Sequence, residues 1–353
     1  MRHTLNGTIV LGKHVYFCHT PNYHTLRLEW CCSMVIVPGS ASSALAASMS
    51  ALLDNSVVEP RVKRFADGEI SVEMPKKTGD SCARVVILQS LPTPSSDNLV
   101  ELMLLADSAR RAFSPTSMTL VVPYLCYSRQ DRVMAQQSPD GAFISSLSAK
   151  VIAKILSVSG AEKVVTVDLH SEQSAGFFDT QIANISAYSV FVDYVADSHV
   201  LEKLAVVAPD YGALGRVRAF VGALSAKYGI NSIQVAVIDK YRERPGVSEV
   251  MHVVGNVKDR HCILLDDLVD SAGTLCNAAA ALKTRGALSV QGFVTHGVLS
   301  GQAVDKVEAS ELDKLVVTDT IYDEKRSQCG KIKVQTVSAL LADYLLSEVM
   351  KRK

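Results

Sequence analysis

The segment from Ile263 to Thr274 combines residue types that could hold a phosphorylated sugar. Three apolar residues lead into two adjacent acids, and a polar loop follows them. The candidate residues are Asp266, Asp267, Asp270, Ser271, Ala272, Gly273 and Thr274. Backbone N–H groups in such a loop, together with the N-terminus of a helix that starts there, form a cradle for phosphate. The paired acids would repel phosphate, but they suit sugar hydroxyls or a hydrated magnesium ion.

A simpler interpretation of this segment is an ordinary strand-to-helix turn, in which an Asp or a Ser caps the helix. That interpretation accounts for any single residue of the segment. It does not account for three acids around a polar loop that contains glycine. We therefore expect the loop to bind the phosphate of a sugar and the acids to bind its hydroxyls.

Further polar candidates directly follow other apolar segments of the chain. Asp168 is the last residue of the segment 162–168, and His170 lies two residues after it. Asp210 directly follows 204–209. Arg129, Gln130 and Asp131 come soon after 116–123, and Lys240 and Arg242 follow 232–239. In open parallel sheets, ligands bind beyond the carboxyl ends of the strands. If these segments are strands of such sheets, their polar ends share one site.

Lys240 and Arg242 open a polar stretch that continues to Glu249. Two cations on such a loop could close over a polyphosphate and stabilise the charge that develops during transfer of a phosphoryl group. Taken alone, they fit the solvated end of a strand better. The nearby phosphate loop and Asp210 favour the catalytic interpretation.

The framework that must position these groups is of the α/β class. Apolar runs without alternation are typical of strands covered on both faces. They occur at 31–37, 84–90, 116–123, 162–168, 204–209, 232–239, 261–267, 289–295, 314–318 and 331–335. Segments with helical spacing lie between them at 41–53, 97–113, 144–157, 212–228, 272–285 and 337–350. This alternation predicts mostly parallel sheets flanked by helices, and a length of 353 residues is enough for two domains.

Composition narrows the classes of partner. The 36 basic and 36 acidic side chains cancel, so the chain lacks the positive charge of a dedicated nucleic-acid or membrane-surface binder. No apolar run approaches the roughly 18 residues of a membrane span. The eight cysteines form no CxxC pair, which indicates a reducing compartment, and we expect a cytoplasmic protein. Residues 1–28 contain no acid, so they form either an N-terminal extension or an organellar targeting peptide.

The segment Ile263–Thr274 resembles the phosphoribosyl-pyrophosphate fingerprint of type I phosphoribosyltransferase-like proteins. Four further segments narrow the resemblance to the ribose-phosphate pyrophosphokinase family. They are Arg64–Glu69, Tyr127–Arg132, Val167–Gln173 with Gly176–Asp179 after it, and Ile238–Arg242. The resemblance implies two similar phosphoribosyltransferase-like domains, each a mostly parallel sheet flanked by helices. We expect an extension at 1–32, an ATP-side domain at 33–182 and a ribose-phosphate-binding domain at 183–353.

The resemblance also implies a reaction. The pyrophosphoryl group of Mg-ATP is transferred to the C1 hydroxyl of ribose 5-phosphate, which gives phosphoribosyl pyrophosphate and AMP. By resemblance, the ATP-binding residues are Phe65, Asp67, Glu69, Arg129, Gln130, Asp131 and His170, and a neighbouring subunit contributes the first three. The pyrophosphate loop is Asp210, Tyr211, Gly212 and Ala213. His170 and Asp210 bind the magnesium ion with Asp168 as a nearby acid, and Lys240 and Arg242 are catalytic.

The partners implied by the resemblance are ATP, ribose 5-phosphate and further copies of the chain, assembled through dimers into a hexamer. One alternative is a non-catalytic regulatory homologue, which would lack Lys240, Arg242, His170 or Asp210. Another alternative is a phosphoribosyltransferase that consumes the activated sugar. That protein would need the phosphate loop but not the ATP-side segments.

Three alanines depart from the family's pattern. Ala272 and Ala213 stand where many relatives have glycine. A methyl group is tolerated there if φ is negative, but it is strained if φ is positive. Ala183 replaces the usual aspartate, so we expect no secondary metal contact at that position.

Overall fold

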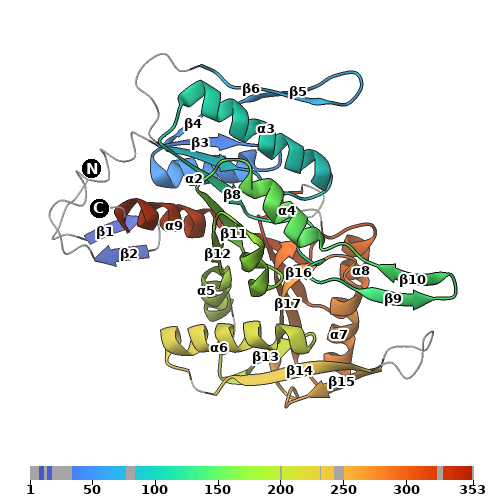
Figure 1. Ribbon diagram of the computed structural model, residues 1–353. Coiled ribbons are helices and arrows are strands. Elements are labelled where there is room, and N and C mark those ends of the chain that lie inside the picture. The colour runs from blue at the N-terminus through green and yellow to red at the C-terminus, as the bar shows by residue number, and fades with distance from the viewer. Residues whose placement is uncertain are drawn as a thin grey trace.

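The computed structural model describes residues 8–11, 14–17, 34–76, 84–198, 201–230, 232–241, 250–323 and 329–351. Their strands form two large sheets, one in each half of the chain (Figure 1). The first is parallel, in the order β12-β11-β8-β7-β3-β4. Its strands are β3 (Met34–Pro38), β4 (Ser56–Val57), β7 (Arg84–Leu88), β8 (Ser117–Val122), β11 (Lys163–Val167) and β12 (Gln181–Ile185).

The second sheet has the order β15-β14-β13-β16-β17-β18-β19 and is parallel except for the β14–β15 pair. Its strands are β13 (Leu204–Ala208), β14 (Gln234–Tyr241), β15 (Val250–Val254), β16 (His261–Val269), β17 (Ser289–Gly297), β18 (Lys314–Thr318) and β19 (Ile332–Gln335). Separate hairpins are formed by β1 (Thr8–Leu11) with β2 (His14–Phe17), β5 (Arg61–Arg64) with β6 (Ile70–Glu73), and β9 (Ala135–Ser138) with β10 (Gly141–Ile144). These sheets confirm the predicted α/β class.

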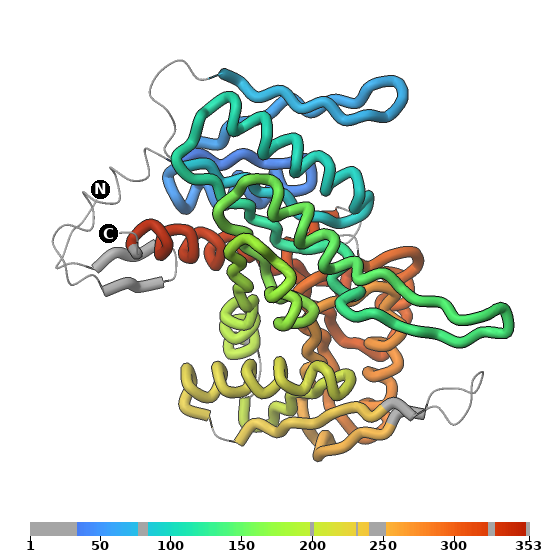
Figure 2. The backbone as a smooth tube through the Cα atoms, in the orientation of Figure 1, coloured from blue at the N-terminus to red at the C-terminus, as the bar shows by residue number. Residues whose placement is uncertain are grey.

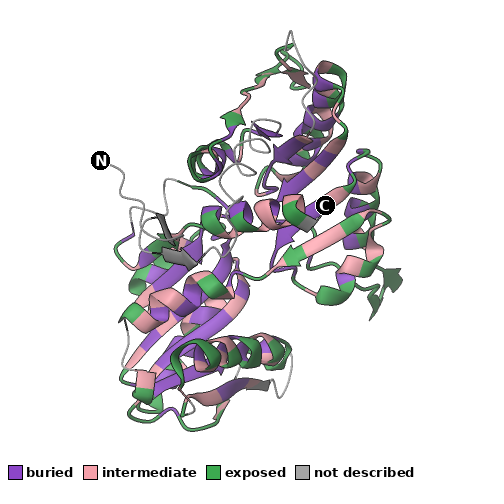
Figure 3. Ribbon diagram, turned by 90° about the vertical axis from the view of Figure 1, so that its left-hand side faces the viewer, coloured by how far each residue is buried: buried purple, intermediate pink, exposed green. Residues whose placement is uncertain are grey.

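Helices cover both faces of each sheet. They are α2 (Ser43–Leu53), α3 (Ser95–Phe113), α4 (Ser148–Ser157), α5 (Tyr188–Ser198), α6 (Leu214–Tyr228), α7 (Gly273–Thr284), α8 (Ala303–Ala309) and α9 (Ser338–Lys351), with short 3-10 helices η1 (Glu172–Phe177), η2 (Leu201–Lys203) and η3 (Tyr211–Ala213). Side chains of α3 and α4 pack on one face of the first sheet, and those of α7 and α8 pack on one face of the second. Buried residues therefore follow the strands and the inner faces of the helices (Figure 3).

The remaining faces of the two sheets share one core. This core joins Ile36 of the first sheet and Ile263 of the second through α2, α5, α6 and α9. The C-terminal helix α9 returns to the first domain and packs against α2 (Figure 2). Glu348 of α9 also pairs with Lys163 of β11. The two halves are thus packed together, which fixes the carboxyl ends of their strands relative to each other.

The structure contains all the predicted strands and helices, with bounds shifted by a few residues, and adds several elements. The sequence of α5, YSVFVDYVADS, is rich in β-branched and aromatic residues, which are weak helix formers. Its Phe191 and Val195 are buried in the shared core, so tertiary packing outweighs the local preference.

The domain boundary expected between residues 182 and 183 falls inside β12, which pairs with β11 of the first sheet. No helix among the described ranges is long and apolar enough to span a bilayer.

We predict that Leu341→Ala destabilises both halves of the protein together. Leu341 is fully buried in the shared core, so its truncation should lower the free energy of unfolding by about 2 to 5 kcal/mol. Urea unfolding followed by circular dichroism should show one transition at a lower midpoint. Leu288→Ala is the control, because Leu288 is 48% exposed and should change stability by less than about 0.5 kcal/mol. Two separate transitions in Leu341→Ala would contradict a shared core.

Candidate active site

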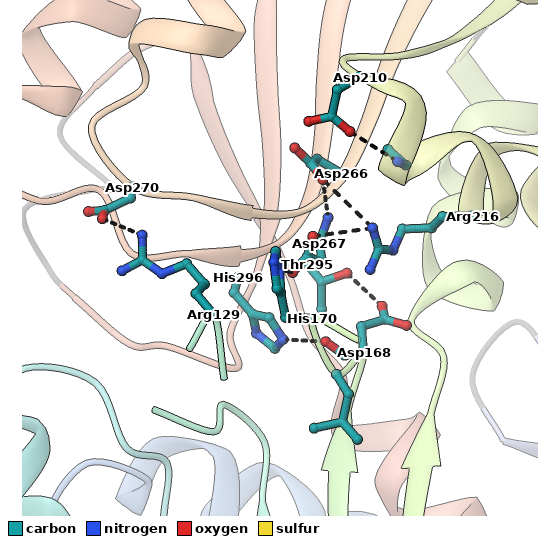
Figure 4. A network of polar contacts seen from close by, with 12 residues as sticks. Arg129, Asp168, His170, Asp210, Arg216, Asp266, Asp267, Asp270, Thr295 and His296 are labelled. Atoms are coloured by element: carbon teal, nitrogen blue, oxygen red, sulfur yellow. Dashed lines mark hydrogen bonds and ion pairs between the residues drawn. The ribbon is translucent and has the colours of Figure 1, made fainter. Parts of the chain in front are cut away.

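The two domains meet at a hydrogen bond between a histidine and an aspartate. His170 follows the end of β11 by three residues, and its Nδ1 lies 2.8 Å from Oδ2 of Asp267 in β16 (Figure 4). The Asp267 side chain is only 4% exposed, whereas that of His170 is 40% exposed. The sequence interpretation placed both residues at a site but did not pair them. Because Nδ1 faces Asp267, the other ring nitrogen of His170 is available for a ligand.

Arg216 neutralises the acid pair, and no sequence motif pointed to it. It lies on α6, and its Nη1 is 3.2 Å from Oδ1 of Asp267 and 3.7 Å from Oδ1 of Asp266. Its side chain is 15% exposed. The backbone N–H of Asp267 also donates to Oδ1 of Asp266 at 2.9 Å. The one signal in the sequence is a cation on the first turn of the helix that follows Ala213.

These contacts shift the pKa values of the two carboxylates in opposite directions. Burial raises the pKa of Asp266 to about 8, and the adjacent charge of Asp267 adds to this effect. Burial also opposes ionisation of Asp267, but the hydrogen bond from His170 and the charge of Arg216 outweigh it and lower the pKa of Asp267. The same hydrogen bond raises the pKa of His170. Asp267 is therefore the carboxylate that carries the negative charge of the pair near neutral pH.

The phosphate loop follows β16 and is held from two sides. Asp270 accepts from Nη1 of Arg129 at 2.8 Å, and Ser300 Oγ donates to its other oxygen. The Ser300 N–H also donates to the backbone oxygen of Asp270 at 3.1 Å. Ser271 and Thr274 are exposed, and α7 begins at Gly273. The arrangement joins an ATP-side candidate, Arg129, to the predicted cradle, and it adds Ser300, which the sequence interpretation missed.

Backbone strain is concentrated around the site. Four non-glycine residues with positive φ follow strands there: Tyr127 (58°), Asp168 (40°), Ala272 (60°) and Leu299 (48°). Such conformations cost roughly 1 to 3 kcal/mol each and persist only where the surroundings hold them. Ala272, with its φ of 60°, is the strained case of the two alanines that replace glycine, whereas Ala213 has an ordinary φ of −79°. The two departures from glycine therefore have different consequences.

The predicted pyrophosphate loop follows β13. Asp210 accepts from the N–H of Ala213 at 3.1 Å and caps η3. Tyr211 and Gly212 are exposed, and β13, which leads to Asp210, pairs with β16, the strand that carries Asp266. Asp168, by contrast, is buried, and its Oδ2 accepts from the N–H of Ala187 and from Thr295 Oγ1. Asp168 thus supports the site from inside the protein.

The remaining candidates lie at the margin of the site or away from it. Gln130 accepts from Ser148 Oγ at 2.5 Å and is exposed, and Asp131 is close enough to His170 to raise the pKa of its imidazole. Phe65, Asp67 and Glu69 form the tip of the β5–β6 hairpin, at the far side of the first domain from β16 (Figure 1). Arg242 and the side chain of Lys240 lie outside the described residues.

The residues present suit a magnesium ion only if substrate completes its coordination. Within the described ranges, no group of three or more His, Cys, Asp or Glu side chains is arranged to enclose a metal. Magnesium usually keeps several waters and takes one or two carboxylates together with substrate phosphates. Asp210 supplies one carboxylate of that kind, and the outer nitrogen of His170 is a second donor, although oxygen is the preferred ligand for this ion.

We predict different effects on stability for glycine at the two alanines. Ala272→Gly removes the methyl group that makes the left-handed backbone unfavourable. This stabilises the folded state by roughly 1 to 2 kcal/mol, which offsets the added flexibility of the unfolded chain. Ala213→Gly has no strain to relieve and should lower the free energy of unfolding by about 0.5 to 1 kcal/mol. Urea denaturation of both variants checks this. An equal loss of stability in both would show that Ala272 is unstrained.

We predict that Asp266→Asn changes how stability depends on pH. Folded Asp266 keeps its proton up to about pH 8, whereas an unfolded aspartate loses it near 3.8. The folded state therefore binds more protons between these values, and this group makes the free energy of unfolding fall as the pH rises. The free energy of unfolding of Asp266→Asn should not fall in this way, whereas that of Asp140→Asn, at the exposed β9–β10 tip, should fall as in the wild type. Urea denaturation at a series of pH values measures this free energy. If it changes with pH equally in the wild type and in Asp266→Asn from pH 4 to 8, the raised pKa of Asp266 is contradicted.

Comparison with known proteins agrees with this geometry. Residues 34–160 match the family model described as the N-terminal domain of ribose phosphate pyrophosphokinase, and residues 231–351 match that of the phosphoribosyl synthetase-associated domain. The ribose-phosphate pyrophosphokinase of Bordetella parapertussis is 42% identical over 88% of this chain and 96% of its own. That of Haemophilus influenzae is 41% identical over 87% and 93%.

A solved structure shows the same architecture over nearly the whole chain. The crystal structure of phosphoribosylpyrophosphate synthetase from Mycobacterium smegmatis superposes with a TM-score of 0.79 at 28% identity. The match covers 91% of this chain and 100% of that one. Together with the identities above, it establishes that the chain belongs to the ribose-phosphate pyrophosphokinase family.

Proposed function

We propose that this chain transfers the pyrophosphoryl group of Mg-ATP to the C1 hydroxyl of ribose 5-phosphate, giving phosphoribosyl pyrophosphate and AMP. The observation that carries the proposal is the junction of Asp266, Asp267 and the phosphate loop with His170 and Arg129 of the other domain. A phosphoribosyltransferase would need only the first part of this junction. Family membership supports the same reaction, and no described feature favours a non-catalytic homologue.

The second domain binds the sugar phosphate in this proposal. The backbone N–H groups of the loop Ser271–Thr274 and the start of α7 receive the phosphate, with hydroxyls of Ser271 and Thr274 as further donors. Asp266 and Asp267 accept hydrogen bonds from the ribose hydroxyls. Arg216 keeps the acids in place by offsetting their charge. The sugar is thereby held with its C1 hydroxyl toward the domain junction.

The first domain and the loop after β13 bind the nucleotide. Arg129 offers a guanidinium to phosphate oxygens, and Gln130 and Asp131 lie beside it. His170 and Asp210 would hold the magnesium ion of ATP, which neutralises charge on the phosphates when it is bound. Asp210, Tyr211, Gly212 and Ala213 receive the pyrophosphate portion. Asp168 holds the backbone from which His170 extends.

Lys240 and Arg242 are the catalytic cations of this proposal. β14 ends at Tyr241 and pairs with β13, whose end leads to Asp210. In the reaction, the C1 oxygen forms a bond to the β-phosphorus, and the bond from that phosphorus to the oxygen of the α-phosphate breaks, so AMP leaves. Cations positioned on the transferred group stabilise its charge as this exchange occurs.

Assembly and location belong to the same proposal. Phe65 is 60% exposed at the tip of the β5–β6 hairpin, which lies at the far side of the first domain from β16 (Figure 1), so we assign it to the nucleotide site of a neighbouring copy. This favours a homo-oligomer, which we propose to be a hexamer built from dimers. Cys126, Cys262, Cys276 and Cys329 are free thiols, which supports a reducing, cytoplasmic location.

We predict that AMP appears from ATP and Mg²⁺ only when ribose 5-phosphate is present. Lys240→Ala should lower kcat by about 10² to 10³, because it removes one preorganised donor to the transferred group. A coupled AMP assay on the intact protein measures both effects. Lys258→Ala, an exposed lysine in the turn before β16, should leave the rate unchanged. No AMP from the wild type, or AMP without the sugar phosphate, would overturn the proposed function.

A further inference from the structure

A second contact between the domains lies behind the site. Near the end of β17, Thr295 Oγ1 donates to Oδ2 of Asp168 at 2.6 Å. The next residue, His296, places Nε2 2.9 Å from the backbone oxygen of Val167 and 3.2 Å from that of Asp168 (Figure 4). We propose that Thr295 and His296 are positioning residues that hold Asp168 and thereby place His170 against Asp267. This inference rests on the role proposed above for His170.

Asp168 needs such support because its backbone is strained. Its φ is 40°, a left-handed conformation that a side chain makes unfavourable. Its own domain holds the turn from the side of β12. The N–H of Asp168 donates to the backbone oxygen of Ile185, that of Leu169 donates to Asn184 Oδ1 at 2.9 Å, and that of Ala187 donates to Asp168 Oδ2. Thr295 and His296 bind the opposite side of the turn from the second domain. The turn is therefore held on both sides when the two domains are packed together.

His296 is itself held in one orientation. Its side chain is 3% exposed, and its ring lies 5.1 Å from the ring of Tyr124. Nε2 faces two carbonyl oxygens, which only accept, so this nitrogen carries the proton. Nδ1 lies 3.0 Å from Thr320 Oγ1, which can donate to it. The imidazole is thus a fixed donor to the backbone of the strained turn.

The consequence for the site follows from chain geometry. His170 is two residues beyond Asp168, and its imidazole reaches Asp267 of the domain that also supplies Thr295. Without the Thr295 hydroxyl, Asp168 Oδ2 loses its bond to the second domain and, among the described residues, keeps the Ala187 N–H, so we expect the strained Asp168 backbone to relax toward negative φ. That relaxation would rotate His170 away from Asp267. Loss of a partner that orients a metal ligand typically lowers metal affinity or activity 10- to 100-fold.

The test compares three variants of the full chain. Thr295→Val removes the hydroxyl, Thr295→Ser restores it, and Ser338→Ala removes another buried hydroxyl, whose partner is Thr336 beside the start of α9. Crystal structures of the ligand-free variants give the distance from His170 Nδ1 to Asp267 Oδ2. We expect that contact to break in Thr295→Val and to persist at 2.8 Å in the other two. If it persists in Thr295→Val, or breaks equally in Ser338→Ala, the inference is wrong.

Kinetics supply the second readout. We expect kcat/KM for Mg-ATP to fall 10- to 100-fold in Thr295→Val and to recover in Thr295→Ser, while Ser338→Ala loses stability but keeps its rate. A fall shared by Thr295→Val and Ser338→Ala would overturn a positioning role. The crystallographic distance needs no turnover. A wild type that forms no AMP would therefore refute the proposed function and still leave the placement of His170 to be decided by that distance.

Discussion

The buried carboxylate of Asp267 is the constraint on which the site depends. A charge that is nearly withdrawn from water is strongly destabilising unless it is paired and hydrogen-bonded. Asp267 meets this requirement with His170 from the first domain and Arg216 from the second. Each domain therefore needs the other to complete the pairing. The shared core behind the strands keeps the two partners at that spacing.

The site concentrates features that are unfavourable for folding alone. Two adjacent acids, one with its pKa raised by burial, lie at a site where several residues after the strands have left-handed backbone conformations. Such features persist at functional sites when the surrounding structure holds them. Here the support comes from buried strands and from bonds such as those of Ser300 to Asp270 and Thr295 to Asp168. The result is a rigid set of oxygen acceptors and cations that requires little rearrangement when charged ligands arrive.

Local chemistry explains which parts could be predicted from the sequence. Asp266, Asp267 and the loop before α7 belong to one strand–loop–helix unit, so their proximity follows from their order in the chain. Arg216, Ser300 and Thr295 contact these residues only because of how the strands and helices pack, and their local sequences carry no comparable signal. The helix α5 was missed for a related reason, since packing of its β-branched and aromatic residues decides its conformation.

The most direct test of the central claim is a crystal structure with ribose 5-phosphate. The account predicts the phosphate against the N–H groups of Ser271–Thr274 and the ribose hydroxyls on Asp266 and Asp267, with the His170–Asp267 contact kept. The matched experiment on Asp267→Asn should show lost or weakened occupancy at the same concentration. Sugar phosphate bound elsewhere in the wild type, or an empty loop at saturating concentration, would contradict the account.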